Sequence, residues 1–424
     1  MVDGLYIFKI DQKDDPRLNG FSTILRPADL SGRRGVDLSQ LSDVCAYADE
    51  LLGFAVFRPG RQPTRFIKKL LGGGGSLALS LPEGVANYSI AINEDIQETA
   101  SALKEGEASA PTPWYVDRLG GWPTATGDGQ CIAILDTGVV FGSHLLPRKS
   151  DHSDFCDCSR PGSNTYESNG HGTSCAGTAG GFRNEPMRMT PAQRSRIVVA
   201  RIWRNASRTL VDILMMMSWA VHGWDVRVVS MSFNEGEKSL HKQSDPDMIG
   251  RAAQRLRSMN RALVFSSARG YKNGLGYPAR TRGVVAVQGY VRAKQSARPD
   301  AGPISVVPLT SDAKREHWCV QQDVFIAPAE RLISIDRHGE QGTFSGLSAA
   351  CAFVAGVAAL YFERYQSYTV EQVLSQMKVD AERIVDTNDP SHVWLGITFP
   401  RSSARSSPQA SDSETDPGNG SASR

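Results

Sequence analysis

Three short segments, far apart in the chain, each contain a residue that could take part in nucleophilic hydrolysis. Asp136 follows the apolar run 131–135, His171 stands in Gly-His-Gly-Thr, and Ser348 stands in Gly-Leu-Ser-Ala-Ala. A serine hydroxyl is a weak nucleophile until a base takes its proton and a third group orients that base. Histidine and aspartate are residue types that fill these two roles. We therefore predict a hydrolytic triad of Asp136, His171 and Ser348.

The surroundings of Asp136 and His171 decide how far each residue supports this prediction. Taken alone, Asp136 could simply end a strand or cap a helix, and a lone histidine in a glycine-rich turn is more often structural. The small residues that follow His171 indicate a helix start that packs tightly against its neighbours and leaves the imidazole at the open end. This setting favours His171 as a base, with Asp136 as the group that orients it.

Ser348 stands at the predicted start of a nearly all-apolar helix, 348–364. The N-terminus of a helix directs free N–H groups and the positive end of its dipole at a developing oxyanion. An N-cap serine is the alternative reading, and the position permits it as well. Ser345 is the competing nucleophile, but it comes one helical turn earlier. We expect Asp136, His171 and Ser348 to meet in one cleft at the C-terminal ends of strands.

From Trp114 onward, buried apolar strands alternate with helices. This alternation is typical of βαβ units around a parallel sheet. We therefore predict an α/β fold with a mostly parallel sheet flanked by helices. The expected strands are Cys131–Leu135, Ile197–Arg201, Val226–Ser232, Ala262–Ser266 and Gly283–Gln288. The expected helices are 211–222, 348–364 and 370 to about 384, the last with a capping box at Thr369 and Gln372.

Residues 1–110 are predicted to form a separate small α/β segment. Tyr6–Ile10 alternates like a strand, whereas Leu38–Leu52 and Glu94–Glu107 have the character of helices. The segment could be a propeptide-like inhibitor and folding chaperone or a permanent accessory domain, and both readings stay open. The expected division is an N-terminal segment 1–110, a main domain 111–400 and a disordered tail 401–424, which consists almost only of Ser, Ala, Gly, Pro, Asp and Arg.

The composition argues against some classes of binding partner. The chain has 424 residues and a formal net charge of only +2, which gives no electrostatic case for nucleic acid or an anionic membrane. The N-terminus is charged too early for a signal peptide, and the apolar runs are expected to be too short to span a bilayer. Seven cysteines without a repeating framework fit reduced thiols. A cytoplasmic protein without a cofactor is expected.

Two groups of residues could carry further chemistry, and in both the structural reading is favoured. His152, Cys156 and Cys158 have the residue types of a zinc site but lack a fourth ligand at a usual spacing, so no metal is expected there. Cys175 and Cys351 lie one helical turn past His171 and Ser348. They should therefore be near the site, where small buried hydrophobic side chains are the favoured interpretation.

The segments around the three residues resemble those of the subtilisin-like serine proteases (subtilases). The order Asp, His, Ser matches that family, and further segments between residues 114 and 398 resemble it too, namely 219–220, 225–226, 229–232, 277–279, 284–287, 323–328 and 394–396. The resemblance implies a parallel sheet with flanking helices and serine endopeptidase activity on a protein or peptide substrate. It also implies a substrate cleft framed by Ser230, Met231, Ser232, Phe233, Asn234, Ser266, Ser267 and Ala268.

One departure from the family concerns the oxyanion hole. Arg269 stands where the family has an asparagine, and Asn273, four residues later, is a second candidate donor. An arginine can donate hydrogen bonds, but its longer fork does not superimpose on an amide. Losing one such donor slows acylation about 10²–10³-fold. The alternative function is therefore a pseudoprotease, a peptide-binding or scaffolding module that keeps the triad geometry without turnover.

Overall fold

The structure of the protein is a computed structural model, which describes part of the chain in detail. The described residues are 6–9, 23–25, 46–49, 52, 54–57, 84–86, 89–91, 101–102, 113–140, 146, 153–157, 169–202, 207–234, 248–271, 274–292, 306–308, 323–386 and 389–400. The tail 401–424, His152, Cys158 and Asn273 lie outside the described residues.

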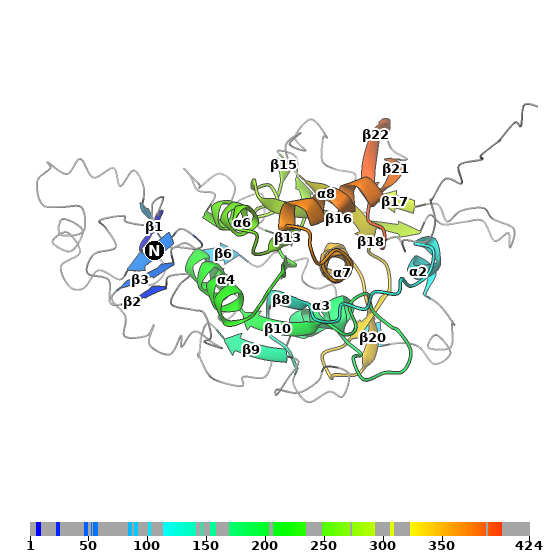
Figure 1. The fold of residues 1–424 in the computed structure, drawn as a ribbon, viewed down its shortest axis with the longest axis horizontal. Coiled ribbons are helices and arrows are strands. Elements are labelled where there is room, and N and C mark those ends of the chain that lie inside the picture. The colour runs from blue at the N-terminus through cyan, green and yellow to red at the C-terminus, as the bar shows by residue number, and fades with distance from the viewer. Residues whose placement is uncertain are drawn as a thin grey trace, which may run out of the picture.

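A ten-stranded sheet forms the centre of the molecule (Figure 1). Its strand order is β21-β22-β18-β16-β13-β12-β8-β10-β9, with β17 paired to β16, and the run from β22 to β9 is parallel throughout. The strands are β8 (Cys131–Asp136), β9 (Ser153–Asp157), β10 (Arg196–Arg201), β12 (Val228–Met231), β13 (Leu263–Ser267), β16 (Val284–Arg292), β17 (Val306–Pro308), β18 (Val324–Pro328), β21 (Glu382–Asp386) and β22 (Asp389–Gly396). The predicted mostly parallel α/β sheet is confirmed.

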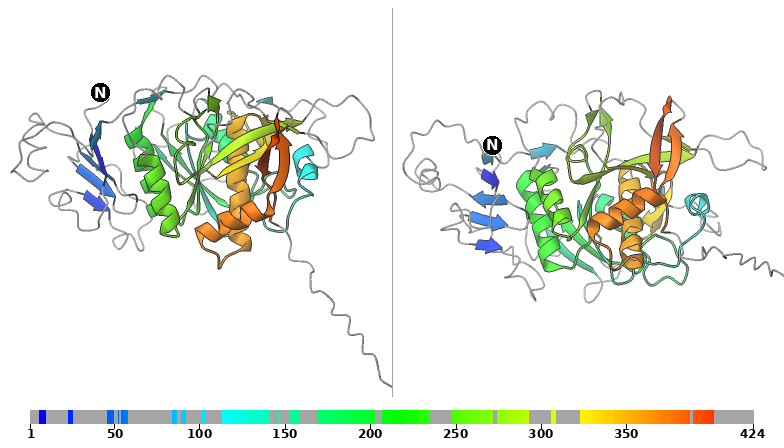
Figure 2. Two further views of the ribbon diagram at one scale, coloured as in Figure 1. Left: turned by 90° about the horizontal axis from the view of Figure 1, so that it is seen from above. Right: turned by 45° about the horizontal axis from the view of Figure 1, so that its top comes forward.

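Helices cover both faces of this sheet, as the two views in Figure 2 show. The helices are α2 (Trp114–Arg118), α3 (His171–Gly180), α4 (Leu210–Gly223), α6 (Met248–Ser258), α7 (Leu347–Arg364) and α8 (Val370–Asp380). Along β8, Ile132 and Ile134 join the core with α3 and α7, whereas Ala133 and Leu135 join the core with α4 and α6. Because successive side chains of a strand point to opposite faces, one apolar strand holds both helical layers on the sheet.

The contact between α3 and α7 depends on the absence of a side chain at Gly356. A Cβ atom built on Gly356 would lie only 2.4 Å from the backbone oxygen of Ala179 in α3. The two helices therefore approach to backbone contact at this point. Since α3 begins with His171 and α7 begins at Leu347, just before Ser348, the same contact sets the spacing of the two predicted catalytic segments.

The described N-terminal elements are strands. They are β1 (Tyr6–Lys9), β2 (Thr23–Leu25), β3 (Ala46–Asp49), β4 (Phe54–Phe57) and β5 (Gly84–Ala86), in one sheet of order β2-β3-β4-β1-β5. At the end of β3, the buried Asp49 carboxylate lies 3.1 and 3.2 Å from Nε2 of His222 in α4 and accepts a hydrogen bond from the N–H of Leu52. This buried pair joins the N-terminal sheet to the helical layer.

Three small sheets complete the described architecture. They pair β6 (Ser89–Ala91) with β11 (Ser207–Thr209), β14 (Gly270–Tyr271) with β15 (Gly274–Leu275), and β7 (Ser101–Ala102) with the hairpin β19 (Leu332–Ile335) and β20 (Gln341–Phe344). Thus β6 and β7 tie residues before position 110 to the main part of the chain. The division of the chain at residue 110 stays a prediction.

Three expectations about individual elements are wrong. Residues 46–49 form a strand rather than part of a helix 38–52, because they pair with β2 and β4. Residues 101–102 likewise form a strand instead of part of a helix 94–107, because they pair with β20. The helix that begins after the capping box of Thr369 and Gln372 ends at Asp380, not near Ile384, since 382–386 pairs with β22 and buries Ile384. In each case pairing within a sheet overrides the local helical pattern.

Helix α7 begins one residue before the predicted range 348–364 and is nearly all apolar, as the sequence led us to expect. Among the described residues it is the one helix with the length and composition to cross a bilayer, and 83% of that window is buried inside the molecule. Its side chains pack against β13, β16 and β18 in the core. A core helix explains this composition.

The packing at Gly356 predicts a loss of stability on adding one methyl group. Gly356→Ala would gain helix propensity, but its Cβ would meet the Ala179 carbonyl, so overpacking should lower the free energy of unfolding by about 1–3 kcal/mol. Thermal unfolding followed by circular dichroism measures the change. The control is Ser375→Ala at an exposed position of α8, where the gain in propensity should stand alone. An equal or higher melting temperature in Gly356→Ala would show that the helices do not touch there.

Candidate active site

Asp136 is the last residue of β8, at the C-terminal edge of the parallel sheet. Its side chain is completely buried. Oδ1 accepts hydrogen bonds from the N–H of Thr137 at 2.7 Å and lies 2.7 Å from Nδ1 of His171. Oδ2 is buried and has no hydrogen-bond partner among the described residues. Because burying a carboxylate is costly without compensation, its hydrogen bonds to the imidazole and to the Thr137 N–H help to stabilise it in the interior.

His171 is the first residue of α3, and its side chain is 1% exposed. The segments of Asp136 and His171 are joined by backbone-to-side-chain hydrogen bonds: Gly172 N–H donates to Thr137 Oγ1, and Val140 N–H donates to Thr173 Oγ1. A Cβ on Gly172 would lie 2.1 Å from the Gly138 carbonyl oxygen, so the close approach of the two segments requires glycine. These contacts hold the His171 imidazole within hydrogen-bond distance of the Asp136 carboxylate.

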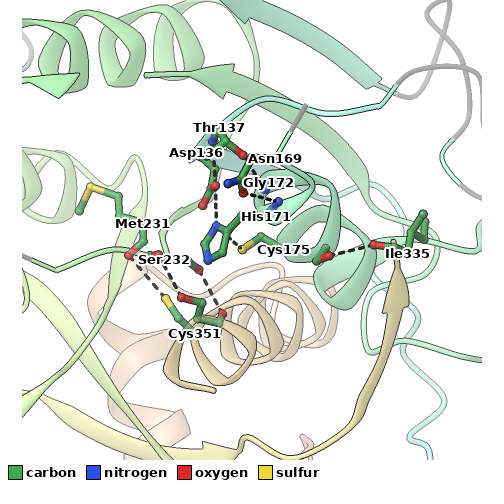
Figure 3. A network of polar contacts seen from close by, with 12 residues as sticks. Asp136, Thr137, Asn169, His171, Gly172, Cys175, Met231, Ser232, Ile335 and Cys351 are labelled. Carbon is green, nitrogen blue, oxygen red and sulfur yellow. Dashed lines mark hydrogen bonds and ion pairs between the residues drawn. The ribbon is translucent and has the colours of Figure 1, made fainter. Parts of the chain in front are cut away.

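Further contacts orient the imidazole. The His171 N–H donates to Oδ1 of Asn169 at 3.1 Å, which supports the first turn of α3. The ring packs edge-on against Phe344, with the centroids 5.6 Å apart and an interplanar angle of 84°. Figure 3 shows the imidazole directed away from Asp136, toward the segment that carries Ser232. Nδ1 thus faces the carboxylate and Nε2 faces the neighbouring segments.

Ser348, in the first turn of α7, is held against the end of β12. Its Oγ donates to the backbone oxygen of Ser232 at 3.1 Å, and Ser232 Oγ donates to the backbone oxygen of Ser348 at 3.1 Å. Ser348 is 9% exposed, whereas Ser232 is fully buried. The competing Ser345 is engaged elsewhere, since its Oγ accepts from the N–H of Arg331.

Two buried thiols link the helices of His171 and Ser348 to the end of β12. Cys175 Sγ lies 3.8 Å from His171 Nδ1 and also hydrogen-bonds to Ser232, while Cys351 Sγ lies 3.9 Å from the Met231 oxygen (Figure 3). Burial, reinforced by the charge of Asp136, raises the pKa of Cys175 well above its usual range. Burial raises the pKa of Cys351 to about 12. Both thiols therefore remain protonated, in keeping with their interpretation as small core residues.

The residues predicted to frame a substrate cleft lie at the ends of β12 and β13. Ser230, Met231, Ser266 and Ser267 belong to the strands, and Ser232, Phe233, Asn234 and Ala268 follow them. All eight are buried, the most exposed being Asn234 at 7%. Of the two oxyanion candidates, Arg269 follows β13 and its N–H donates to Asn234 Oδ1, whereas Asn273 lies outside the described residues.

Asp136, His171 and Cys175 are residue types that can bind a metal ion, and their possible ligand atoms lie within 4.8 Å of one another. His171 Nδ1 is already hydrogen-bonded to the carboxylate, and the neighbouring thiol is protonated. A metal would have to displace this hydrogen bond and release the thiol proton. The arrangement therefore suits proton transfer through the imidazole better than metal binding.

Sequence reasoning missed the roles of Ser232 and Asn234. Ser232 exchanges two hydrogen bonds with Ser348, and Asn234 bridges the ends of two strands. A local signal exists, because both polar residues come soon after the apolar strand β12 ends. Their partners come from α7 and β13, which the local sequence does not identify.

The protonated state of the thiols predicts that the folded protein resists alkylation. Only the thiolate attacks iodoacetamide, so Cys175 and Cys351 should stay unmodified at pH 8 for hours, as should the buried Cys131, whose pKa is also about 12. Mass spectrometry of native and denaturant-treated samples measures modification at each cysteine, and the denatured sample serves as the control. Rapid modification of Cys175 in the native protein would contradict the raised pKa.

Comparison with known proteins shows which family the chain belongs to. Residues 127–399 match the profile of the subtilase family, Peptidase_S8. The chain is 28% identical over 257 residues to the thermostable alkaline protease of Halalkalibacterium halodurans, an alignment that covers 60% of this chain and 63% of that protein. It is 25% identical to the serine protease AprX of Bacillus subtilis, covering 64% of this chain and 65% of that protein. The chain thus spans somewhat less than two thirds of either relative.

Solved structures support the same fold. Sphericase superposes with a TM-score of 0.55 at 20% identity, covering 69% of this chain and 99% of its own. The S41 psychrophilic protease superposes with a TM-score of 0.53 at 20% identity, covering 69% of this chain and 98% of its own. The family profile covers well over half of the sequence, and the chain belongs to the subtilase family of subtilisin-like serine proteases.

Proposed function

We propose that this protein is a serine endopeptidase in which Asp136, His171 and Ser348 act as a catalytic triad. The observation that carries the proposal is the buried 2.7 Å contact between Asp136 Oδ1 and His171 Nδ1. Ser348, in the first turn of α7, is held by Ser232, which also hydrogen-bonds to the thiol of Cys175 in the helix that begins with His171. The names of its relatives, a thermostable alkaline protease and a serine protease, support the same activity.

In the acylation step, His171 Nε2 takes the proton of Ser348 Oγ while the oxygen attacks the carbonyl carbon of the scissile peptide bond. The Ser348 hydroxyl donates to the Ser232 carbonyl in the structure, so it must first turn toward the imidazole. The buried Asp136 carboxylate stabilises the imidazolium that forms and keeps Nε2 directed at the serine. The tetrahedral intermediate collapses when His171 gives the proton to the leaving amine.

Negative charge on the former carbonyl oxygen is stabilised by the backbone N–H of Ser348 and by the positive end of the α7 dipole. Arg269 or Asn273 supplies the second donor. Water then attacks the acyl-enzyme, His171 takes a proton from that water, and Ser348 regains its proton as the carboxylic acid leaves. The protein or peptide substrate binds as an extended strand against residues 230–234, because backbone pairing accepts many sequences.

The triad predicts large losses of activity for single substitutions. Ser348→Ala should lower kcat on a chromogenic peptide by about 10⁶-fold, and Asp136→Asn by about 10⁴-fold because the imidazole adopts the wrong tautomer. Ser345→Ala is the matched control, since this serine lies three residues earlier and its hydroxyl accepts a hydrogen bond from Arg331. Loss of activity in Ser345→Ala with full activity in Ser348→Ala would refute the assignment.

The oxyanion hole gives a separate prediction. If the Arg269 side chain is the second donor, Arg269→Asn should keep or raise the acylation rate, because an amide fits the geometry of the family. If Asn273 is the donor, Asn273→Ala should lower kcat by about 10²–10³-fold while Arg269→Asn changes little. Single-turnover acylation rates of the wild type and both variants distinguish the two.

Two further outcomes of this experiment are informative. Equal rates in all three proteins would mean that neither side chain is the donor. An inert wild type that gains activity as Arg269→Asn would count against the enzyme and for a pseudoprotease.

A further inference from the structure

The side chain of Asn234 joins the end of β12 to the end of β13. Its Nδ2 donates to Ser267 Oγ at 2.8 Å, and its Oδ1 accepts from the N–H of Arg269 at 3.3 Å. One residue earlier, the backbone oxygen of Phe233 accepts a hydrogen bond from Ser266 Oγ. Asn234 is 7% exposed and Ser267 is completely buried. The space between the two strand ends is therefore filled by a hydrogen-bonded amide.

The orientation of this amide follows from its partners. A backbone N–H can only donate, so the group that faces Arg269 N–H must be the carbonyl oxygen of the side chain. The NH₂ group must then face Ser267, whose hydroxyl oxygen accepts. Because both ends of the amide are engaged in hydrogen bonds, one of them to the buried Ser267, moving it aside would break its contacts with the Ser267 hydroxyl and with the N–H of Arg269. The amide is a fixed wall and not a mobile side chain.

The sheet order indicates which part of a substrate would meet this wall. Strand β12 lies between β8 and β13. His171 is anchored to Asp136 at the end of β8, and Ser348 is anchored to Ser232 just after β12. In the proposed reaction His171 protonates the leaving amine, so the amine side of the scissile bond must lie toward β8. The acyl side, with the residue that precedes the bond, must then lie toward β13.

We infer that Asn234 restricts cleavage to bonds preceded by a small residue such as glycine, alanine or serine, because its side chain occupies the space that a larger side chain would need. The inference rests on the proposed function, and it names the substrate class of that site. Asn234 is a specificity-determining residue in this view. A leucine or phenylalanine before the bond would have to displace an amide that holds Ser267 and Arg269.

Peptide p-nitroanilides that differ only in the residue before the anilide test the inference. Wild type should cleave the alanine peptide with a kcat/KM about 10²-fold above that of the phenylalanine peptide. In Asn234→Gly, which removes the wall, the phenylalanine-to-alanine ratio should rise by about tenfold or more. Asn184→Gly, at an exposed position outside the site, is the matched control and should keep the wild-type ratio.

A wild type that cleaves the phenylalanine peptide as fast as the alanine peptide would overturn the inference, as would a folded Asn234→Gly with an unchanged ratio. The wild-type comparison needs no variant, so it decides the matter even if Asn234→Gly fails to fold. Labelling by a small fluorophosphonate tests Ser348 chemistry without any preceding residue. Labelling together with fast phenylalanine cleavage overturns the specificity alone, whereas absence of both labelling and peptide cleavage overturns the proposed function and the inference with it.

Discussion

The buried hydrogen bond between Asp136 and His171 is the interaction on which the site depends. Burying a carboxylate with no exposed surface costs free energy, and here the imidazole and the Thr137 N–H both hydrogen-bond to it in the interior. Keeping the two groups 2.7 Å apart requires the end of β8 and the start of α3 to touch at backbone distance. Gly172 makes that contact possible, since any side chain there would strike the Gly138 carbonyl.

The same requirement for close approach recurs on the other side of α3. Its contact with α7 passes through Gly356, so the helix that begins with His171 and the helix that bears Ser348 have a fixed separation. Ser232 then fixes Ser348 against β12 by two reciprocal hydrogen bonds. Because β8, β12 and β13 are parallel neighbours, their ends present Asp136, Ser232 and Ser267 along one edge. Parallel pairing is therefore what converts three distant segments into one site.

The sequence predicted best what depends on local chemistry. The small residues around His171 and Ser348 indicated both helix starts to within one residue, and the capping box at Thr369 is present as expected. It predicted least where a distant partner decides. Residues 101–102, for example, carry a helical signal but pair as a strand with β20, which lies far along the chain. The hydrogen bonds of Asn234 could not be predicted from the local sequence either. Its partners Ser267 and Arg269 lie on the next strand of the sheet and in the segment that follows it.

The central claim is that Asp136, His171 and Ser348 act as one unit, and a double-mutant comparison tests it most directly. Residues that share one mechanism lose their effect together, so the rate loss of a double variant should not exceed that of the worse single variant. We predict that kcat on one chromogenic peptide is the same, within about threefold, for Ser348→Ala, His171→Ala and the double variant. Rate losses that multiply in the double variant would show that the two residues act independently, and would contradict the account.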